Sequence, residues 1–316
     1  MAVTAYCLLT SEIICSKSIL PALPLCYCLH MRHGFLLIDK PVGPTSHDTV
    51  ALVRRALSEP KIGHLGTLDP AASGLLVLAV GAKALKAIEL FDDLNKEYDA
   101  GIRFGAVSTT YDREGVIEEI VPKPGWTEPD IADLQRLIAE RFIGKIAQVP
   151  PVYSAVKVGG ERAYRKMRQG REVNLPAREV KIDACDILSY TYPELLLRVS
   201  CGSGTYIRSL AHDLGAAVRF GAYLSSLRRT RVGEWSVDNA VAPENVAWAH
   251  VMPLKEILSP FGGVEVTAGE AEDLCHGRPI ARTVRPDTIA WFECLPIAIL
   301  LPLKDSSQQA RARKVL

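Results

Sequence analysis

A glycine-rich loop that leads directly into an apolar run constrains this fold most. The loop, residues 63–74, holds a single carboxylate, Asp69, and the six-residue run 75–80 ends at Gly81. An apolar run of this length bounded by glycines predicts a strand that is buried on both faces. Pro70 disfavours helical backbone at Asp69 and pushes it toward an extended conformation. The stretch therefore predicts one aspartate displayed on a tight loop at the edge of a sheet.

Two interpretations of this loop are open from its spacing alone. An Asp-Pro pair between glycines is most often a plain turn, in which the aspartate hydrogen-bonds its own backbone. A loop held by a rigid scaffold is also a usual place for a catalytic residue.

Composition limits the classes to which the chain can belong. At 316 residues it can form one large domain and a small one, and a net charge of +1 indicates no general affinity for nucleic acid. The eight cysteines include no Cys-x-x-Cys pair, so a zinc site is not indicated. Reduced thiols fit a cytoplasmic protein. The uncharged run 18–31 is broken by Pro21 and Pro24 and is shorter than the roughly 20 residues that span a membrane.

The first thirty residues lack the features of a domain. Residues 1–30 hold four of the eight cysteines, no glycine, and only Glu12 and Lys17 as charged side chains. They also lack the basic start and clean apolar core of a signal peptide. We expect them to be a non-domain extension and translation to begin at Met31.

Hydrophobic periodicity and turn residues predict a mixture of helices and strands. A strand from Gly34 enters a Pro/Gly turn, and Thr45 or Ser46 then caps a helix that runs to about Leu57. Further helices are expected at about 82–94, 128–141 and 251–257, a helix after the turn 202–205, strands at about 98–104 and 195–201, and short strands within 261–316.

Five motifs lie between residues 34 and 232: GHLGTLDPAASGLLVLAVG, LLIDKPVGPTSHD, QVPPVYSAVK, SGTYIRSLAHDLG and LRRT. Together they resemble the motifs of the TruB family of pseudouridine synthases. The resemblance implies an enzyme that isomerises the uridine at position 55, in the TΨC loop of tRNA, to pseudouridine. Because no group enters or leaves overall, no cofactor is expected.

The resemblance also implies roles for individual residues. Asp69 would be the catalytic nucleophile and Arg208 would pair with it. Tyr98 would stack on the target base, Tyr206 would lie against the uracil site, and Leu227 would pack against the flipped base.

Two further residues are implied as substrate-binding. His64 would fill space near the displaced nucleotides, although a packed loop histidine is an equal alternative. Lys40 would support the active-site loop, although a lysine in a turn is usually just solvated. The segment 108–115 departs from the family pattern, because Thr109 stands where an acidic residue is typical, while Asp112 remains.

The same resemblance implies the architecture. It is a mixed α/β (α+β) pseudouridine synthase core with a largely antiparallel mixed sheet flanked by helices, followed by a small PUA-like β domain. The catalytic domain would span residues 31–245, and residues 246–316 would form a linker helix and the RNA-binding domain. The chain would act on tRNA as a monomer.

A local basic cluster offers an RNA-binding surface. Residues 157–181 contain eight lysines and arginines against three glutamates, with Tyr153 and Tyr164 within or beside them. Such a cluster is usually a solvated face, but interleaved tyrosines are also typical of a surface that contacts RNA phosphates and bases.

Three other functions compete with this one. The chain could modify ribosomal RNA, or it could bind or refold RNA without catalysis. A metal hydrolase is disfavoured because the seven histidines include no His-x-x-x-His or His-Glu pair. A phosphate loop at residues 202–205 is also disfavoured, because it lacks the Lys-Ser/Thr ending.

Overall fold

Strand β3 (Ala72–Val80) forms the apolar run after the Asp69 loop, and it lies inside a ten-stranded sheet rather than at its edge. In this computed structural model the described residues are 33–154, 157–158, 161–162, 175–303 and 306–316. Alternate side chains of β3 enter two different cores. Leu75, Val77 and Ala79 pack into one core, and the residues between them pack into the other. The sheet is thus covered on both faces at β3, which explains why the run contains no polar residue.

The large sheet is mostly antiparallel. Its main path runs β14-β1-β3-β12-β4-β11-β10-β7, with β2 paired to β3 and β13 paired to β12. The pairing of β3 with β12 is parallel. The other strands of this sheet are β1 (Gly34–Lys40), β2 (Ile62–His64), β4 (Lys96–Phe104), β7 (Gly144–Gln148), β10 (Arg178–Thr191), β11 (Glu194–Cys201), β12 (Ala222–Val232), β13 (Trp235–Ser236) and β14 (Met252–Pro253).

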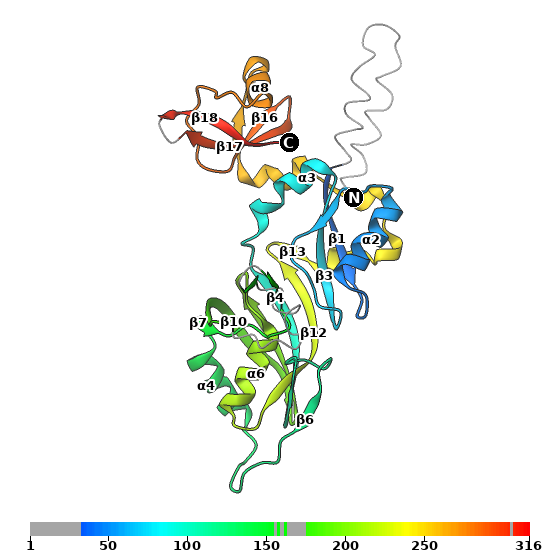
Figure 1. The fold of residues 1–316 in the computed structure, drawn as a ribbon, viewed down its shortest axis with the longest axis vertical. Helices are drawn as coiled ribbons and strands as arrows, with labels where there is room; N and C mark the ends of the chain where they lie inside the picture. Colours follow the sequence, from blue (N-terminus) through cyan, green and yellow to red (C-terminus); the bar gives the residue numbers. More distant parts are fainter. Residues whose placement is uncertain (1–32, 155–156, 159–160, 163–174, 304–305) are drawn as a thin grey trace, which may run out of the picture. The chain divides into compact units, whose positions relative to one another are not determined.

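Helices cover the sheet in separate groups. Helix α2 (Ser46–Leu57) packs its apolar side chains against β1 and β3, whereas α4 (Ile131–Arg141) and α6 (Ile207–Ala217) pack against β4, β10, β11 and β12 (Figure 1). Two short hairpins flank them, one formed by β5 (Ala106–Ser108) and β6 (Ile117–Glu119), the other by β8 (Lys157–Val158) and β9 (Glu161–Arg162). The mixed α/β fold with a largely antiparallel sheet is as predicted.

The helices in the segments 82–94 and 128–141 differ in extent from the sequence prediction. The segment 82–94 contains only the short helix α3 (Ala82–Ala87), followed by the 3-10 turn η1 (Ile88–Phe91). Helix α4 begins three residues later than expected, because Asp130 caps it by accepting a hydrogen bond from the backbone N–H of Asp133. The remaining 3-10 turns are η2 (Val237–Asn239), η3 (Pro243–Asn245), η4 (Trp248–His250) and η5 (Ser259–Phe261).

The C-terminal region forms a second, four-stranded sheet. Its strands are β15 (Gly263–Glu265), β16 (Thr288–Phe292), β17 (Leu295–Leu303) and β18 (Ser306–Val315), in sequence order. Helix α8 (Ala268–Cys275) packs with this sheet in a core of its own. The expected helix at 251–257 is the short α7 (Leu254–Leu258), which shares a core with Ile289 and Ile299.

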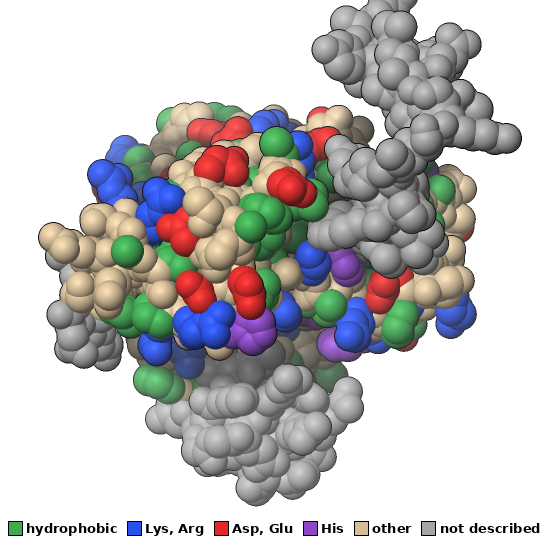
Figure 2. Space-filling view, turned by 90° about the horizontal axis from the view of Figure 1, so that it is seen from above, with side chains coloured by type: hydrophobic (Ala, Val, Ile, Leu, Met, Phe, Trp, Pro, Cys, Tyr) green, Lys and Arg blue, Asp and Glu red, His purple; other side chains and the backbone are tan. Residues whose placement is uncertain are grey.

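Residues His33–Leu316 form one compact unit. On the face shown in Figure 2, Lys and Arg side chains are interspersed with Asp and Glu side chains, in keeping with the small net charge. Within the described part of the chain, no helix is long and apolar enough to cross a membrane. Residues 1–30 lie outside the described residues, as does most of the basic cluster.

Candidate active site

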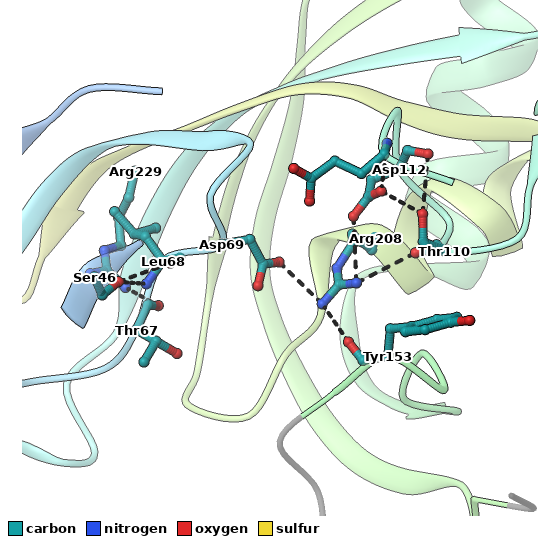
Figure 3. Close-up of polar contacts among 10 residues, drawn as sticks. Ser46, Thr67, Leu68, Asp69, Thr110, Asp112, Tyr153, Arg208 and Arg229 are labelled. Atoms are coloured by element: carbon teal, nitrogen blue, oxygen red, sulfur yellow. Dashed lines mark hydrogen bonds and ion pairs between the residues drawn. The ribbon is translucent and has the colours of Figure 1, made fainter. Parts of the chain in front are cut away.

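The start of helix α2 clamps the loop that carries Asp69. The buried Ser46 hydroxyl accepts a hydrogen bond from the N–H of Leu68 and donates one to its carbonyl, both at 2.8 Å (Figure 3). On the other side of Asp69, the carbonyl of Pro70 accepts a hydrogen bond from the N–H of Gly43 at 2.9 Å. The backbone is therefore fixed on both sides of the aspartate, while Thr45 caps the helix.

Strand β12 supports the same loop through Arg229. This side chain is 2% exposed, and its guanidinium donates to the carbonyls of Leu75 at 2.7 Å, Gly66 at 3.3 Å and Thr67 at 3.4 Å. The two strands approach closely at Gly74, where a Cβ atom would lie 2.3 Å from the Arg229 carbonyl oxygen and where φ is +99°. Only glycine fits this position.

Lys40 supports the turn between β1 and α2. It is fully buried, and its ammonium donates to the carbonyls of Pro41 and Pro44, each at 2.8 Å. Burial lowers the pKa of Lys40, and the negative charge of Asp69 opposes this shift. The same turn provides the Gly43 N–H that donates to the Pro70 carbonyl. Lys40 therefore supports the Asp69 loop indirectly, by holding this turn.

Arg208, in the first turn of α6, lies between two carboxylates (Figure 3). One terminal nitrogen is 3.1 Å from Asp69 Oδ2, and the other is 3.5 Å from Asp112 Oδ2. The side chains of Arg208 and Asp112 are 9% and 7% exposed, whereas that of Asp69 is 45% exposed. The guanidinium also donates to the carbonyls of Tyr153 and Thr110. Asp69 is thus the carboxylate of this group that a ligand can reach.

The beginning of α6 is held by the segment before it. The buried Gln148 accepts a hydrogen bond from the N–H of Tyr206 at 2.8 Å and donates one to its carbonyl at 3.1 Å. The Ser209 hydroxyl donates to the carbonyl of Val149 at 2.7 Å. These contacts fix the position from which Arg208 extends.

A tight loop aims Asp112 at Arg208. Asp112 accepts hydrogen bonds from the Thr110 hydroxyl and from the N–H of Glu114. Tyr111 has a φ of +64°, a conformation that is strained for a bulky residue. Its ring stacks on His212, with centroids 4.0 Å apart and planes at 12°.

Five of the seven residues implied by the resemblance line one cavity. Its volume is about 310 Å³, and its lining includes Asp69, Tyr98, Tyr206, Arg208 and Leu227. Burial raises the pKa of Tyr98, and the positive charge of Arg229 opposes this shift. The cavity therefore combines one accessible carboxylate with aromatic and aliphatic side chains, and a carboxylate in such a position can act as a nucleophile.

His64 and Lys40 lie outside the lining of this cavity. The ring of His64 packs edge to face against His47, with centroids 5.6 Å apart. Burial lowers the pKa of His64, and neighbouring positive groups lower it further. Among the described residues, no group of His, Cys, Asp or Glu side chains is arranged to hold a metal ion.

Comparisons with known proteins identify the family of this chain. The model of the TruB family pseudouridylate synthase N-terminal domain matches residues 54–207, and that of the tRNA pseudouridylate synthase B C-terminal domain matches residues 208–261. The chain is 40% identical over 291 residues to tRNA pseudouridine synthase B of Mycobacterium sp. (strain KMS), covering 90% of this chain and 96% of the relative. It is 42% identical over 272 residues to tRNA pseudouridine synthase B of Thermobifida fusca, covering 83% and 91%.

Solved structures share the fold at lower identity. A crystal structure of a Cbf5-Nop10-Gar1 complex matches with a TM-score of 0.66 and 24% identity, over 91% of this chain and 85% of the matched chain. A structure of an H/ACA RNP bound to a substrate RNA containing 2'-deoxyuridine matches with a TM-score of 0.65 and 21% identity, over 92% and 86%. These matches support the fold, and the sequence relatives establish the family: the chain belongs to the TruB family of pseudouridylate synthases, isomerases that form pseudouridine.

Proposed function

We propose that this chain converts the uridine at position 55, in the TΨC loop of tRNA, to pseudouridine, with Asp69 as the nucleophile. The names of its relatives, tRNA pseudouridine synthase B, support tRNA as the substrate. The placement of Asp69 carries the proposal: its accessible carboxylate lines the cavity and lies 3.1 Å from Arg208.

The reaction is an isomerisation. The bond between uracil N1 and ribose C1′ breaks, the base turns within the cavity, and a new bond joins C5 to C1′. The proton on C5 leaves and N1 gains one, so atoms and electrons balance without an added reagent. The enzyme must therefore supply a nucleophile, a proton acceptor and an enclosure that retains the free base.

Asp69 provides the nucleophile. Its carboxylate can add to ribose C1′ or to base C6, forming a covalent intermediate in either case. Arg208 orients it, because one guanidinium nitrogen contacts Asp69 while the other is held by Asp112.

The target nucleotide must leave its stack to reach Asp69, at a cost of a few kcal/mol. Stacking on an aromatic side chain returns roughly 1–3 kcal/mol per base. Tyr98 and Tyr206 line the cavity and provide such rings, and Leu227 contributes apolar surface that excludes water from the intermediate.

The domains extend this proposal to the whole chain. Residues 31–245 would be the catalytic domain, and residues 246–316 would be a linker helix and a PUA-like RNA-binding domain. The core that α8 forms with one side of the C-terminal sheet supports this division. The enzyme would act as a monomer in the cytoplasm.

The test is the release of tritium from C5-tritiated uridine in a TΨC stem-loop. Wild-type protein should release tritium, and Asp69→Asn should release none while binding the RNA within a few-fold of wild type, because the amide is nearly isosteric but not nucleophilic. Full activity of Asp69→Asn would contradict the role of Asp69.

A second RNA tests the modified position independently of the role of Asp69. It is a stem-loop with cytidine at position 55 and tritiated uridine elsewhere in the loop. This RNA should release no tritium. Release of tritium from it would contradict the assignment of position 55 without contradicting the role proposed for Asp69.

A further inference from the structure

A second cavity adjoins the one that holds Asp69. Its volume is also about 310 Å³, and the two cavities share Thr67, Tyr98 and Thr205 in their linings. Asp69 and Arg208 do not line the second cavity. It is therefore a separate compartment. Because it adjoins the cavity proposed to hold the target uridine, it lies next to the position of the flanking nucleotides.

The charged residues that line this second cavity are two basic ones, Lys96 and Arg229, and one acidic one, Asp92. The guanidinium of Arg229 is bound by three neutral carbonyl oxygens, and in the described part of the chain it forms no ion pair with a carboxylate. A buried charge without a counter-charge is costly, since it loses its hydration. Arg229 therefore contributes a positive charge to the lining of the cavity without a directly paired carboxylate.

Lys96 adds a second positive group. Its ammonium donates to the Ser203 hydroxyl at 2.6 Å and to the Asp92 carbonyl at 3.2 Å, which leaves one of its three protons unused. It forms no ion pair within the described residues either. Burial lowers the pKa of Lys96 and Arg229 lowers it further, while the carboxylates of Asp92 and Asp93 oppose the shift. An anion between the two cations would relieve their repulsion.

The loop 202–205 completes the wall. Gly204 has a φ of +85°, and a Cβ atom there would meet nothing within 4 Å, so the glycine is required for the backbone conformation and not for packing. The N–H groups of Ser203, Gly204 and Thr205 donate to no other described residue. Free N–H groups beside a lysine are typical surroundings for a phosphate oxygen.

We propose that this second cavity binds a backbone phosphate adjacent to the target uridine, through Lys96 and the charge of Arg229. The inference rests on the proposed function, because a flipped nucleotide stays covalently joined to its flanking phosphates. A phosphate therefore accompanies each base that enters the neighbouring cavity. The site acts in binding and contributes no group to the chemical step.

The test pairs a protein variant with a neutralised phosphate. Binding is measured in the Asp69→Asn background, which requires no turnover, using TΨC stem-loops that carry a methylphosphonate at each loop position in turn. Lys96→Met should weaken binding about tenfold, as expected for one charge-assisted hydrogen bond. It should also reduce the slope of log K against log[salt] by about 0.7.

One methylphosphonate adjacent to the target uridine should weaken binding to the parent protein and have no further effect on Lys96→Met. Additive losses at every position would overturn the proposal, because they would show that Lys96 and the phosphates act independently. The proposed function is judged separately, by tritium release.

Matched variants show whether a loss of binding is specific to the charge of Lys96. Lys96→Arg keeps the charge and should retain most of the affinity, and Lys123→Met, at an exposed lysine between β6 and α4, should change nothing. Melting temperatures identify a variant that fails to fold. Inorganic phosphate should compete with the stem-loop for the parent protein and not for Lys96→Met. Competition combined with additive methylphosphonate losses would identify a site for free anions and overturn the assignment to RNA.

Discussion

At the scale of single residues, the site is organised by one arginine that faces two carboxylates in different surroundings. Asp112 is buried with Arg208, whereas almost half of the Asp69 side chain is exposed. Two carboxylates and one guanidinium leave this group with one net negative charge, which is least costly where water reaches it. The accessible carboxylate therefore carries the surplus charge, and it is the one proposed to attack the substrate.

Ser46 offers a test of how tightly the Asp69 loop must be held. Ser46→Ala removes both hydrogen bonds to Leu68 and leaves a buried N–H and carbonyl unpaired, at a cost of about 1–3 kcal/mol. We expect kcat to fall about tenfold or more with KM little changed, because Asp69, the proposed nucleophile, is misplaced while the RNA contacts remain. Single-turnover rates and thermal unfolding would measure both effects.

Thr45→Ala is the matched control, since it removes the cap of the same helix at a cost of about 1 kcal/mol and leaves the Leu68 contacts in place. Comparable losses of kcat in both variants would show that helix stability, and not the loop, limits the rate.

Sequence motifs single out residues that line the cavity better than residues that hold its walls in place. Tyr98, Tyr206 and Leu227 line the cavity with Asp69, while their roles toward a substrate stay predictions. The sequence left open whether Thr45 or Ser46 caps α2, because either hydroxyl can do so. The contacts of Ser46 and Gln148 go to backbone atoms 22 and 58 residues away, so no local pattern reveals them.

At the scale of elements, a strained loop packed against a helix completes the site. Tyr111 stacks on His212, one turn beyond Arg208 on α6, and its neighbours Thr110 and Asp112 both contact Arg208. The stack thus favours the loop conformation that places a carbonyl and a carboxylate around the guanidinium.

Substitution of His212 tests this link. His212→Ala should lower kcat about tenfold by freeing the loop, because Asp112 would no longer be held at Arg208. His212→Phe should restore most of the rate, since a phenyl ring can maintain the stack. Presteady-state rates on saturating stem-loop would compare the two. Equal activity of His212→Ala and wild type would show that the Thr110 and Glu114 hydrogen bonds to Asp112 suffice.

Element types were easier to predict than element limits. The apolar run of β3 and the Gly-x-Gly-Thr turn into α6 follow from local chemistry. The sequence predicts one helix over the segment 82–94. In the structure its second part tightens into η1, where Phe91 packs edge to face on Phe35 of β1. That contact is tertiary, and sequence spacing does not encode it.

At the scale of the whole molecule, charged and apolar contacts join the C-terminal sheet to the rest. Glu89 pairs with Arg313 at 2.8 Å and with Lys314 at 2.9 Å, and Arg313 also pairs with Asp287 at 3.0 Å. Beneath them, Leu316 enters the same core as α3 and α7. The proposed RNA-binding region is thereby fixed on the catalytic region.

Charge reversal tests this connection. Glu89→Arg should lower stability by about 1 kcal/mol, or Tm by roughly 2–4 °C, because it turns two partly exposed attractions into repulsions. It should also weaken binding of full-length tRNA more than that of an isolated stem-loop. Combining it with Lys314→Glu should recover part of both losses. Calorimetry and filter binding would measure them, and the absence of any recovery would show that the Glu89–Lys314 pair does not couple the two regions.

The parallel pairing of β3 with β12 has a consequence for how the protein is made. Its register joins Ala72 to Leu227, so the two ends of the pairing lie about 150 residues apart along the chain. A ribosome releases Asp69 long before it releases β12, which carries both Arg229 beneath the loop and Leu227 in the cavity. A nascent chain therefore holds Asp69 on a loop that lacks the support of Arg229 throughout most of its synthesis. Pairing across so long a separation is slow to form. Catalytic competence should therefore arise late, after β12 has emerged and paired with β3, so partly made chains should not modify the RNAs that surround them on the ribosome.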